Sequence, residues 1–182
     1  MSPGSDSPTL APVESDGLPI DFTRPGVIWL DELPVPIEPT GTGKAVARLR
    51  EGRLVVGGGS RTQVLAAIDR WYRREARKRI EPLVVIEGER LGLEAKKVRI
   101  GNQRTRWGSC STSGTVSFNW RLVIGRPEAL HYVVVHELIH LRHHNHSRAF
   151  WDALAEAFPD FKREATWLRS NERELLKWKP RI

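Results

Sequence analysis

The hydrophobic positions of the chain recur with two different periods. Val116, Phe118 and Trp120 alternate with polar residues, which predicts a half-buried strand that carries these three side chains on one face. Val98 and Ile100 alternate in the same way and predict another strand. Elsewhere the apolar residues recur every three to four positions, as they do along one side of a helix. The pattern therefore predicts a domain that combines strands with helices.

Short apolar runs separated by turn residues characterise the segment that follows the N-terminal region. These runs cover residues 27–30, 45–49 and 54–56. Glu51 and Gly52 lie between the last two runs, and a glycine-containing turn between two such runs is typical of a β-hairpin. We therefore expect strands here, the last two of them paired as a hairpin.

Helical periodicity begins after residue 60. Ser60 is a suitable N-cap for a helix in which Val64, Ile68 and Trp71 recur at helical spacing. Pro82 lies within this pattern and is expected to kink the helix or restart it. Three further helices are expected to start near Pro127, after Ser147 and near Phe161, the last one extending to about Leu176.

Composition sets the domain organisation and the compartment. Residues 1–24 are rich in Ser, Pro, Gly and Asp, which predicts a disordered tail before a single domain over 25–182. Cys110 is the single cysteine of the chain, so an internal disulfide is excluded and a reducing compartment is favoured. No apolar run approaches the about 18 residues of a membrane span, and no secretory leader is recognisable. We expect a cytoplasmic protein without a membrane partner.

Basic residues outnumber acidic ones, 29 to 22, for a net charge of +7. Between Lys96 and Arg106 the chain has five basic residues and no acidic one. Such a segment is compatible with contact to nucleotides, DNA or other polyanions.

One motif stands out within the helix predicted after Pro127. His136 and His140 frame Glu137 in a His-Glu-x-x-His pattern, so on a helix both imidazoles lie on the same face one turn apart. The surrounding residues are mostly Val, Leu and Ile, and burying these polar groups without partners would be costly. If the helix ends near Arg142, the chain can turn back and bring His146 in as a third ligand. This arrangement leaves one tetrahedral position open, as in catalytic zinc sites.

Two known ligand patterns are alternatives to this set. The spacing of His146 resembles that of metzincins, but His143 replaces their glycine and Met1 is the only methionine, so no methionine turn can lie under the metal. A thermolysin-like site would instead use a downstream glutamate, for which Glu156 or Glu164 could serve. His146 is the nearer and more natural third ligand.

The roles of the remaining groups follow from the chemistry of a zinc hydrolase. Glu137 is expected to act as general base, taking a proton from water and passing it to the leaving amine. Tyr132, His143, His144 and Arg106 are candidates for stabilising the negative charge of the tetrahedral intermediate.

The chain resembles the YgjP-like metallopeptidase family, which is related to the SprT-like and WLM zinc proteases. The segments that carry this resemblance are 104–111, 116–122, 132–138 and 145–151. The resemblance implies an α+β, zincin-like domain with an antiparallel sheet packed on helices, Zn²⁺ held by His136, His140 and His146, and polypeptide substrates.

Two other functions remain open at this point. A zinc hydrolase of nucleotide phosphoanhydrides could use the same site, with phosphates held by the basic segment 96–106. A DNA-associated, SprT-like protease is suggested by the positive charge and would bind DNA in a strongly salt-dependent manner. A purely structural zinc site explains neither Glu137 nor a set of three ligands.

Overall fold

The computed structural model describes residues 22 and 24–182. The predicted tail, residues 1–24, therefore lies almost entirely outside the described part. Phe22 is an exception, because its side chain is buried and packs edge-on against Trp29 with ring centroids 5.3 Å apart. The hydrophobic core thus includes a residue that composition alone assigned to the tail.

The N-terminal sheet has four strands, β1 (Val27–Leu30), β2 (Leu33–Pro39), β3 (Ala47–Arg50) and β4 (Arg53–Val56), in the order β1-β2-β4-β3. β3 and β4 are antiparallel, and Glu51 and Gly52 connect them with φ angles of 48° and 74°. The predicted hairpin is therefore confirmed. β2 and β4 are parallel, so this sheet is mixed.

A single long helix, α1 (Arg61–Leu91), follows this sheet. The Ser60 side chain accepts a hydrogen bond from the Gln63 backbone N–H at 3.3 Å, as expected for an N-cap. The helix does not restart at Pro82 but continues for nine more residues. Because proline has no N–H, the Lys78 carbonyl loses its helical hydrogen bond. Pro82 and Lys78 are both exposed, so water can supply the missing donor. Val84 is buried and keeps this part of the helix packed on the core.

The second sheet consists of β5 (Lys97–Gly101), β6 (Gly108–Cys110) and β7 (Thr115–Asn119) in the order β5-β7-β6. β6 and β7 are antiparallel, but β5 and β7 are parallel. The expected antiparallel sheet is therefore corrected to a mixed one. The chain reverses its direction twice, between β5 and β6 and again between β6 and β7. β7 therefore runs in the same direction as β5.

The predicted alternation in β7 is confirmed, with Val116 and Phe118 completely buried. Trp120 is buried too, but it begins a short 3₁₀ helix, η1 (Trp120–Val123), instead of ending the strand. The Asn119 side chain accepts a hydrogen bond from the Arg121 backbone N–H at 3.1 Å and so turns the chain out of the sheet.

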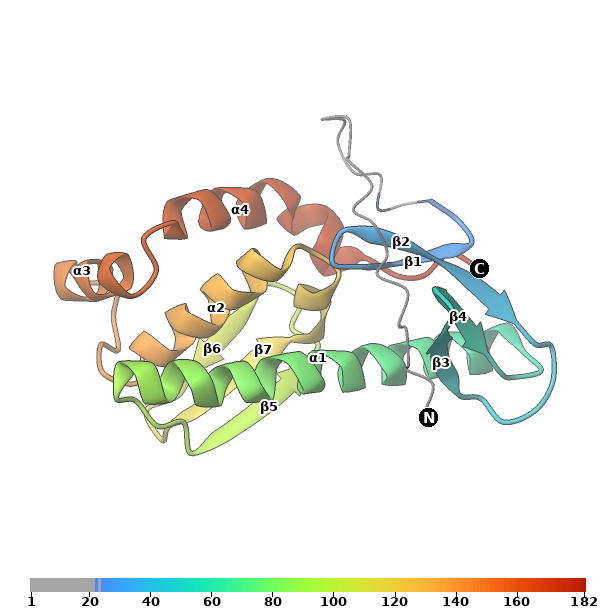
Figure 1. Cartoon of the computed structure of the whole chain (residues 1–182), viewed down its shortest axis with the longest axis horizontal. Helices are drawn as coiled ribbons and strands as arrows, with labels where there is room; N and C mark the ends of the chain where they lie inside the picture. Colours follow the sequence, from blue (N-terminus) through green and yellow to red (C-terminus); the bar gives the residue numbers. More distant parts are fainter. Residues whose placement is uncertain (1–21, 23) are drawn as a thin grey trace, which may run out of the picture.

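Three helices complete the domain, α2 (Pro127–Ile139), α3 (Arg148–Ala157) and α4 (Phe161–Lys177). α2 contacts α1, α3, α4 and β6, and in Figure 1 it lies between α1 and α4. This central position explains why α2 is apolar on nearly all sides. The domain is thus an α+β fold, as predicted, built around the helix that carries the histidine motif.

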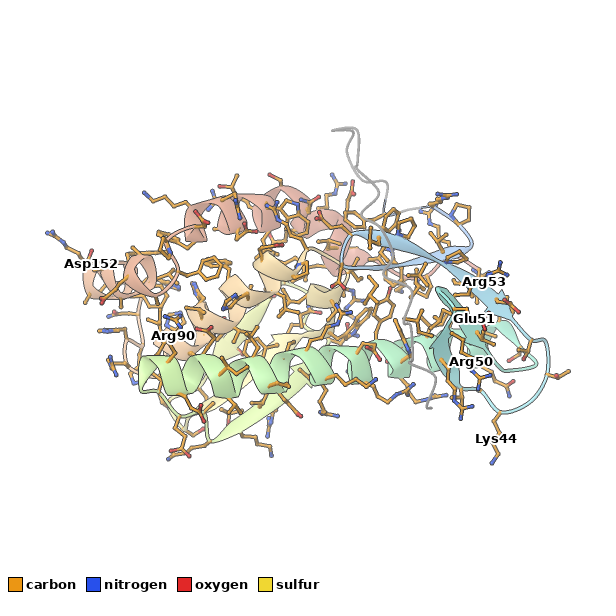
Figure 2. All side chains as sticks on the ribbon, in the orientation of Figure 1. Lys44, Arg50, Glu51, Arg53, Arg90 and Asp152 are labelled. Carbon is orange, nitrogen blue, oxygen red and sulfur yellow. The ribbon has the colours of Figure 1, made fainter. Side chains whose placement is uncertain are left out.

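Charged side chains mark the outer surface of the molecule. Lys44, Arg50 and Arg53 project from the loop and strands at one end, and Arg90 and Asp152 lie near the other (Figure 2). In the described part of the chain no helix is long and apolar enough to cross a membrane.

Candidate metal centre

Three imidazole rings converge at the C-terminal end of α2. His136 and His140 lie one turn apart on this helix, and His146 comes from the segment that leads into α3. Their Nε2 atoms are 3.2 Å apart for His136 and His140, 3.2 Å for His140 and His146, and 3.1 Å for His136 and His146. Within the described residues, this is the one group of three or more potential ligands that could hold a metal ion.

The positions of the three nitrogens are explained better by coordination of one metal ion than by hydrogen bonds among them. Each ring nitrogen carries either one hydrogen or one lone pair, so three mutual contacts cannot all be hydrogen bonds. The Nδ1 atom of His140 lies 2.8 Å from the His143 carbonyl oxygen. Nδ1 must therefore donate there, which leaves the lone pair of Nε2 facing the centre of the group.

The spacing and the electrostatics of the group agree with this assignment. Nitrogens about 2.0–2.1 Å from a tetrahedral metal ion are about 3.3 Å from each other, close to the separations found here. Burial, reinforced by the neighbouring His140 and His146, lowers the pKa of His136 to about 3. The imidazole is thus held in the neutral form that can donate a lone pair.

The backbone after α2 brings His146 into place. The helix ends at Ile139, three residues before the predicted end, and a tight turn follows in which the Arg142 and His143 N–H groups both donate to the Ile139 carbonyl, at 3.0 and 2.9 Å. The chain reverses there, and Ser147 starts α3. The predicted return of His146 towards the other two histidines is confirmed.

Two aromatic residues of α3 support the imidazole rings. Phe150 is completely buried and contacts all three rings, stacking on His140 at 4.4 Å and meeting His136 and His146 at 4.9 and 4.8 Å between centroids. Trp151, which is 40% exposed, stacks on His146 at 5.5 Å. The three imidazole rings thus pack on the hydrophobic ring of Phe150.

Glu137 lines a cleft of about 330 Å³ that also includes its neighbour His136. Its side chain is only 6% exposed. Burial raises the pKa of the Glu137 carboxyl to about 8, and the positive charge of Arg106 opposes this shift only in part. A carboxyl group whose pKa lies close to neutral pH is able both to accept and to give up a proton.

Gly108 is required by the close approach of β6 to Glu137. A Cβ atom at this position would lie 2.5 Å from Glu137 Oε1 and 2.6 Å from its Cγ. Because such contacts are far below van der Waals separation, any side chain at residue 108 would push the carboxyl away. β6 therefore forms one wall of the cleft and fixes the space that Glu137 occupies.

Of the four candidates for stabilising the negative charge of the tetrahedral intermediate, two line the cleft with Glu137 and two do not. Tyr132 and Arg106 line the cleft with Glu137, and the Tyr132 hydroxyl lies 3.4 Å from His136 Nδ1. His143 lines a different cavity, and exposed His144 does not line the cleft. Arg106 and Tyr132 are thus the two sequence candidates that line the same cleft as Glu137.

The two glutamates considered as alternative ligands lie elsewhere. Glu164 is completely buried and forms ion pairs with Arg163 Nε at 2.7 Å and Arg126 Nε at 2.9 Å, although the latter contact lacks hydrogen-bond geometry. Glu156 lines the cavity that contains His143. Neither carboxylate joins the group of three histidines.

Sequence reasoning missed the parts played by Phe150 and Gly108. The position of Phe150 four residues after His146 was the available signal for a contact with that ring. Gly108 gave no signal, because only the fold shows that Glu137 lies against it.

A His-Glu-x-x-His helix completed by a third histidine is the site of the metallopeptidase class. The chain belongs to the YgjP-like family, since the model of the YgjP-like metallopeptidase domain matches residues 22–171. The family resemblance in the sequence is therefore confirmed. Membership makes the protein a metallopeptidase relative and implies polypeptide substrates.

The solved structures that are similar to this chain include two described as metallopeptidase zymogens. Abylysin of Pyrococcus abyssi matches with a TM-score of 0.47 and 22% identity, over 57% of this chain and 99% of its own. Jannalysin of Methanocaldococcus jannaschii matches with a TM-score of 0.44 and 25% identity, over 52% of this chain and 95% of its own. No curated protein matches the chain.

Proposed function

We propose that the protein is a zinc-dependent metallopeptidase, with His136, His140 and His146 as ligands and Glu137 as general base. The convergence of three imidazole Nε2 atoms beside a buried glutamate carries this proposal. Three histidines with an open fourth position form a ligand set typical of catalytic zinc. When bound, zinc lowers the pKa of water and polarises the carbonyl of the substrate.

Glu137 performs the proton transfers in this proposal. Its carboxylate takes the proton of the attacking water and then delivers it to the nitrogen of the leaving amine. Because Glu137 is only 6% exposed, competing proton exchange with solvent is limited. Arg106 and Tyr132 line the same cleft and are placed to stabilise negative charge on the substrate oxygen.

The edge strand β6 offers a way to hold a polypeptide. In the order β5-β7-β6 one side of β6 has no strand partner within the described sheet. An extended peptide can pair with such an edge through backbone hydrogen bonds, which are independent of its sequence. Because Gly108 of β6 lies against Glu137, a peptide bound there would pass beside the proposed general base.

The proposed function is tested by assaying the purified protein, loaded with zinc, against an unfolded polypeptide and against nucleoside triphosphates in parallel. We expect hydrolysis of the polypeptide that stops on removal of zinc with a chelator and returns when zinc is added back. Zinc-dependent turnover of nucleoside triphosphates alone would overturn the proposal.

A second candidate function, hydrolysis of nucleotide phosphoanhydrides, is favoured by two basic residues of the cleft. Arg106 and Arg169 line it together with Glu137, and both are exposed. Neither forms an ion pair within the described residues. Guanidinium groups near a reacting centre are suited to phosphate oxygens.

The variant Arg169→Gln discriminates between these two functions. If the substrate is a polypeptide without an acidic side chain near the bond, we expect KM to change less than about threefold, because an exposed charge contributes little. If the substrate is a nucleotide, losing a charge-assisted contact to phosphate should raise KM at least about tenfold. Arg173→Gln, on the exposed surface of α4, is the matched control.

The variant Gly108→Ala should lose activity while keeping the fold and the metal. The added methyl carbon would lie 2.5 Å from Glu137 Oε1 and so displaces the carboxyl, and a misplaced general base costs about 100-fold in rate. Initial rates and zinc content measure the two effects. Ser109→Ala on the same strand, whose side chain points to the opposite face, should stay within about twofold of the parent. Full activity of Gly108→Ala would show that Glu137 is not held by β6.

A further inference from the structure

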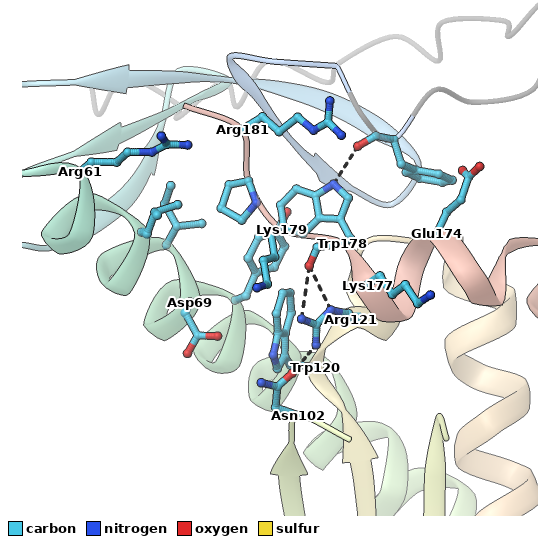
Figure 3. Close-up of a pocket in the computed structure, with 15 residues that line it drawn as sticks. Arg61, Asp69, Asn102, Trp120, Arg121, Glu174, Lys177, Trp178, Lys179 and Arg181 are labelled. Carbon is cyan, nitrogen blue, oxygen red and sulfur yellow. Dashed lines mark hydrogen bonds between the residues drawn. The ribbon is translucent and has the colours of Figure 1, made fainter. Parts of the chain in front are cut away.

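A second and larger cavity, of about 680 Å³, lies away from the histidine group. It is lined by α1, η1, the end of α4 and the segment that follows α4 (Figure 3), and Phe22 also lines it. Among the described residues it shares no lining side chain with the cleft around Glu137. Its volume falls within the range of about 300–1,000 Å³ typical of small-molecule sites. The metallopeptidase chemistry makes no use of it.

The inner wall of this cavity is aromatic and fixed in place. Tyr72 packs against Trp120 at 4.7 Å and against Trp178 at 5.3 Å between ring centroids. The Tyr72 hydroxyl donates to the Trp29 carbonyl at 2.7 Å and accepts from the Trp29 N–H at 3.1 Å. The Trp178 indole N–H donates to the Phe22 carbonyl at 2.9 Å. The wall is therefore preformed for a flat or apolar group.

Arg121 places a buried positive charge in this wall. It is only 7% exposed, and its guanidinium group lies 4.3 Å from the centre of the Trp120 ring. It donates to the Trp178 carbonyl at 3.3 and 3.2 Å and to the Asn102 side-chain oxygen (Figure 3). These partners are neutral, and Arg121 forms no ion pair with any described residue.

A buried charge with only neutral partners is costly, and the cost is reduced by an anion. Burial lowers the pKa of the Arg121 guanidinium, and the negative charge of Asp69 opposes this shift only in part. Its three described hydrogen bonds leave two of its five N–H groups available. The side chain can therefore bind an acceptor inside the cavity without breaking its existing contacts.

The remaining charges of the cavity also favour an anion. The lining has five basic side chains and two acidic ones, Asp69 and Glu174. Asp69 is already paired with Arg73 at 2.7 Å. The basic residues other than Arg121 are Arg61, Lys177, Lys179 and Arg181, which surround the opening (Figure 3). A concave site with this balance attracts negatively charged molecules.

We propose that this cavity is a binding site for a small organic anion, a carboxylate or phosphate attached to an aromatic or apolar body. The anionic group contacts Arg121 and the lysines of the opening, and the body packs against Trp120 and Trp178, which completely buried Tyr72 holds in place. This site is separate from the proposed zinc centre and does not depend on the peptidase activity.

The test measures binding of phenyl phosphate and of phenylacetate to the full chain by titration calorimetry, with phenol as the neutral analogue. At least one anion should bind at one per chain, and at least about tenfold more tightly than phenol, because a charge-assisted hydrogen bond is lost with the charge. The tighter of the two anions identifies phosphate or carboxylate as the preferred group. Equal affinity for phenol would overturn the proposal, and so would absence of binding.

The location of the ligand is tested with variants of the opening. Lys177→Gln combined with Lys179→Gln removes two exposed charges and should weaken anion binding about two- to thirtyfold. Lys44→Gln combined with Lys162→Gln removes the same number of exposed charges elsewhere and should leave the affinity unchanged. Arg121→Gln should weaken binding at least about tenfold, and the lysine variant decides the question if Arg121→Gln does not fold.

Anions can also bind a zinc ion, so the site needs a direct readout. The chain has seven tryptophans, and their indole N–H signals can be followed by NMR during the titration. The signals of Trp120 and Trp178 should shift, whereas that of Trp151, which stacks on His146, should not. A shift confined to Trp151, or an unchanged affinity in the lysine variant, would contradict the assignment.

Discussion

Glu137→Gln should abolish most hydrolysis while leaving zinc bound at one per chain. Glutamine keeps the shape of the side chain in its buried position but cannot accept a proton from water. General base catalysis contributes about 10²- to 10⁴-fold, so kcat should fall by this factor or more. Steady-state rates at saturating polypeptide, together with zinc analysis of the same sample, measure both parts of the expectation.

Glu128→Gln is the control, because it makes the same change on the same helix at an exposed position. Its activity and zinc content should match those of the parent protein. If Glu137→Gln lost its zinc, Glu137 would have to be a ligand, contrary to the proposed role. If it kept both zinc and full turnover, the base would have to be sought elsewhere in the cleft, first at Tyr132.

His146→Ala should lose the metal. Two histidines remain, and one of the three Nε2 atoms that lie within 3.2 Å of each other is removed. Loss of groups that only orient a ligand lowers metal affinity about 10- to 100-fold, so loss of a direct ligand should exceed this range. Competition with a chelator measures the affinity, and hydrolysis should disappear with the metal.

Two controls separate ligation from general damage. His144→Ala removes an exposed histidine from the same turn and should bind zinc like the parent. Glu164→Gln breaks a buried ion pair with Arg126 and should lower the free energy of unfolding by about 3–5 kcal/mol, yet keep its zinc. A folded Glu164→Gln variant without zinc, beside a His146→Ala variant that retains it, would identify Glu164 as the third ligand.

Much of the fold and of the site could be predicted because the relevant signals are local. The spacing of His136 and His140 brings their side chains together on any helix, and the Ser60 cap and the Glu51–Gly52 turn act on their immediate neighbours. These features do not depend on how distant segments pack, and each of them is confirmed.

The features that sequence reasoning missed depend on distant contacts. Gly108 could not be linked to Glu137, because the two are 29 positions apart and meet only through the packing of β6 on α2. The parallel pairing of β5 with β7 is a property of topology, to which the alternation of side chains is insensitive. At Pro82 the local rule predicted a kink or a restart, but the helix does not restart there, and Val84 just beyond it is buried in the core.

The length of α1 has a consequence for how the molecule unfolds. This helix has 31 residues, about 45 Å, and contacts β3 and β4 near its start and β5 and α2 further along. Removing the first sheet would expose the apolar side of α1 around Val64 and Ile68, and the same helix supports the element that carries His136 and His140. The two sheets should therefore melt together in one cooperative transition, with zinc release coinciding with the loss of the N-terminal strands.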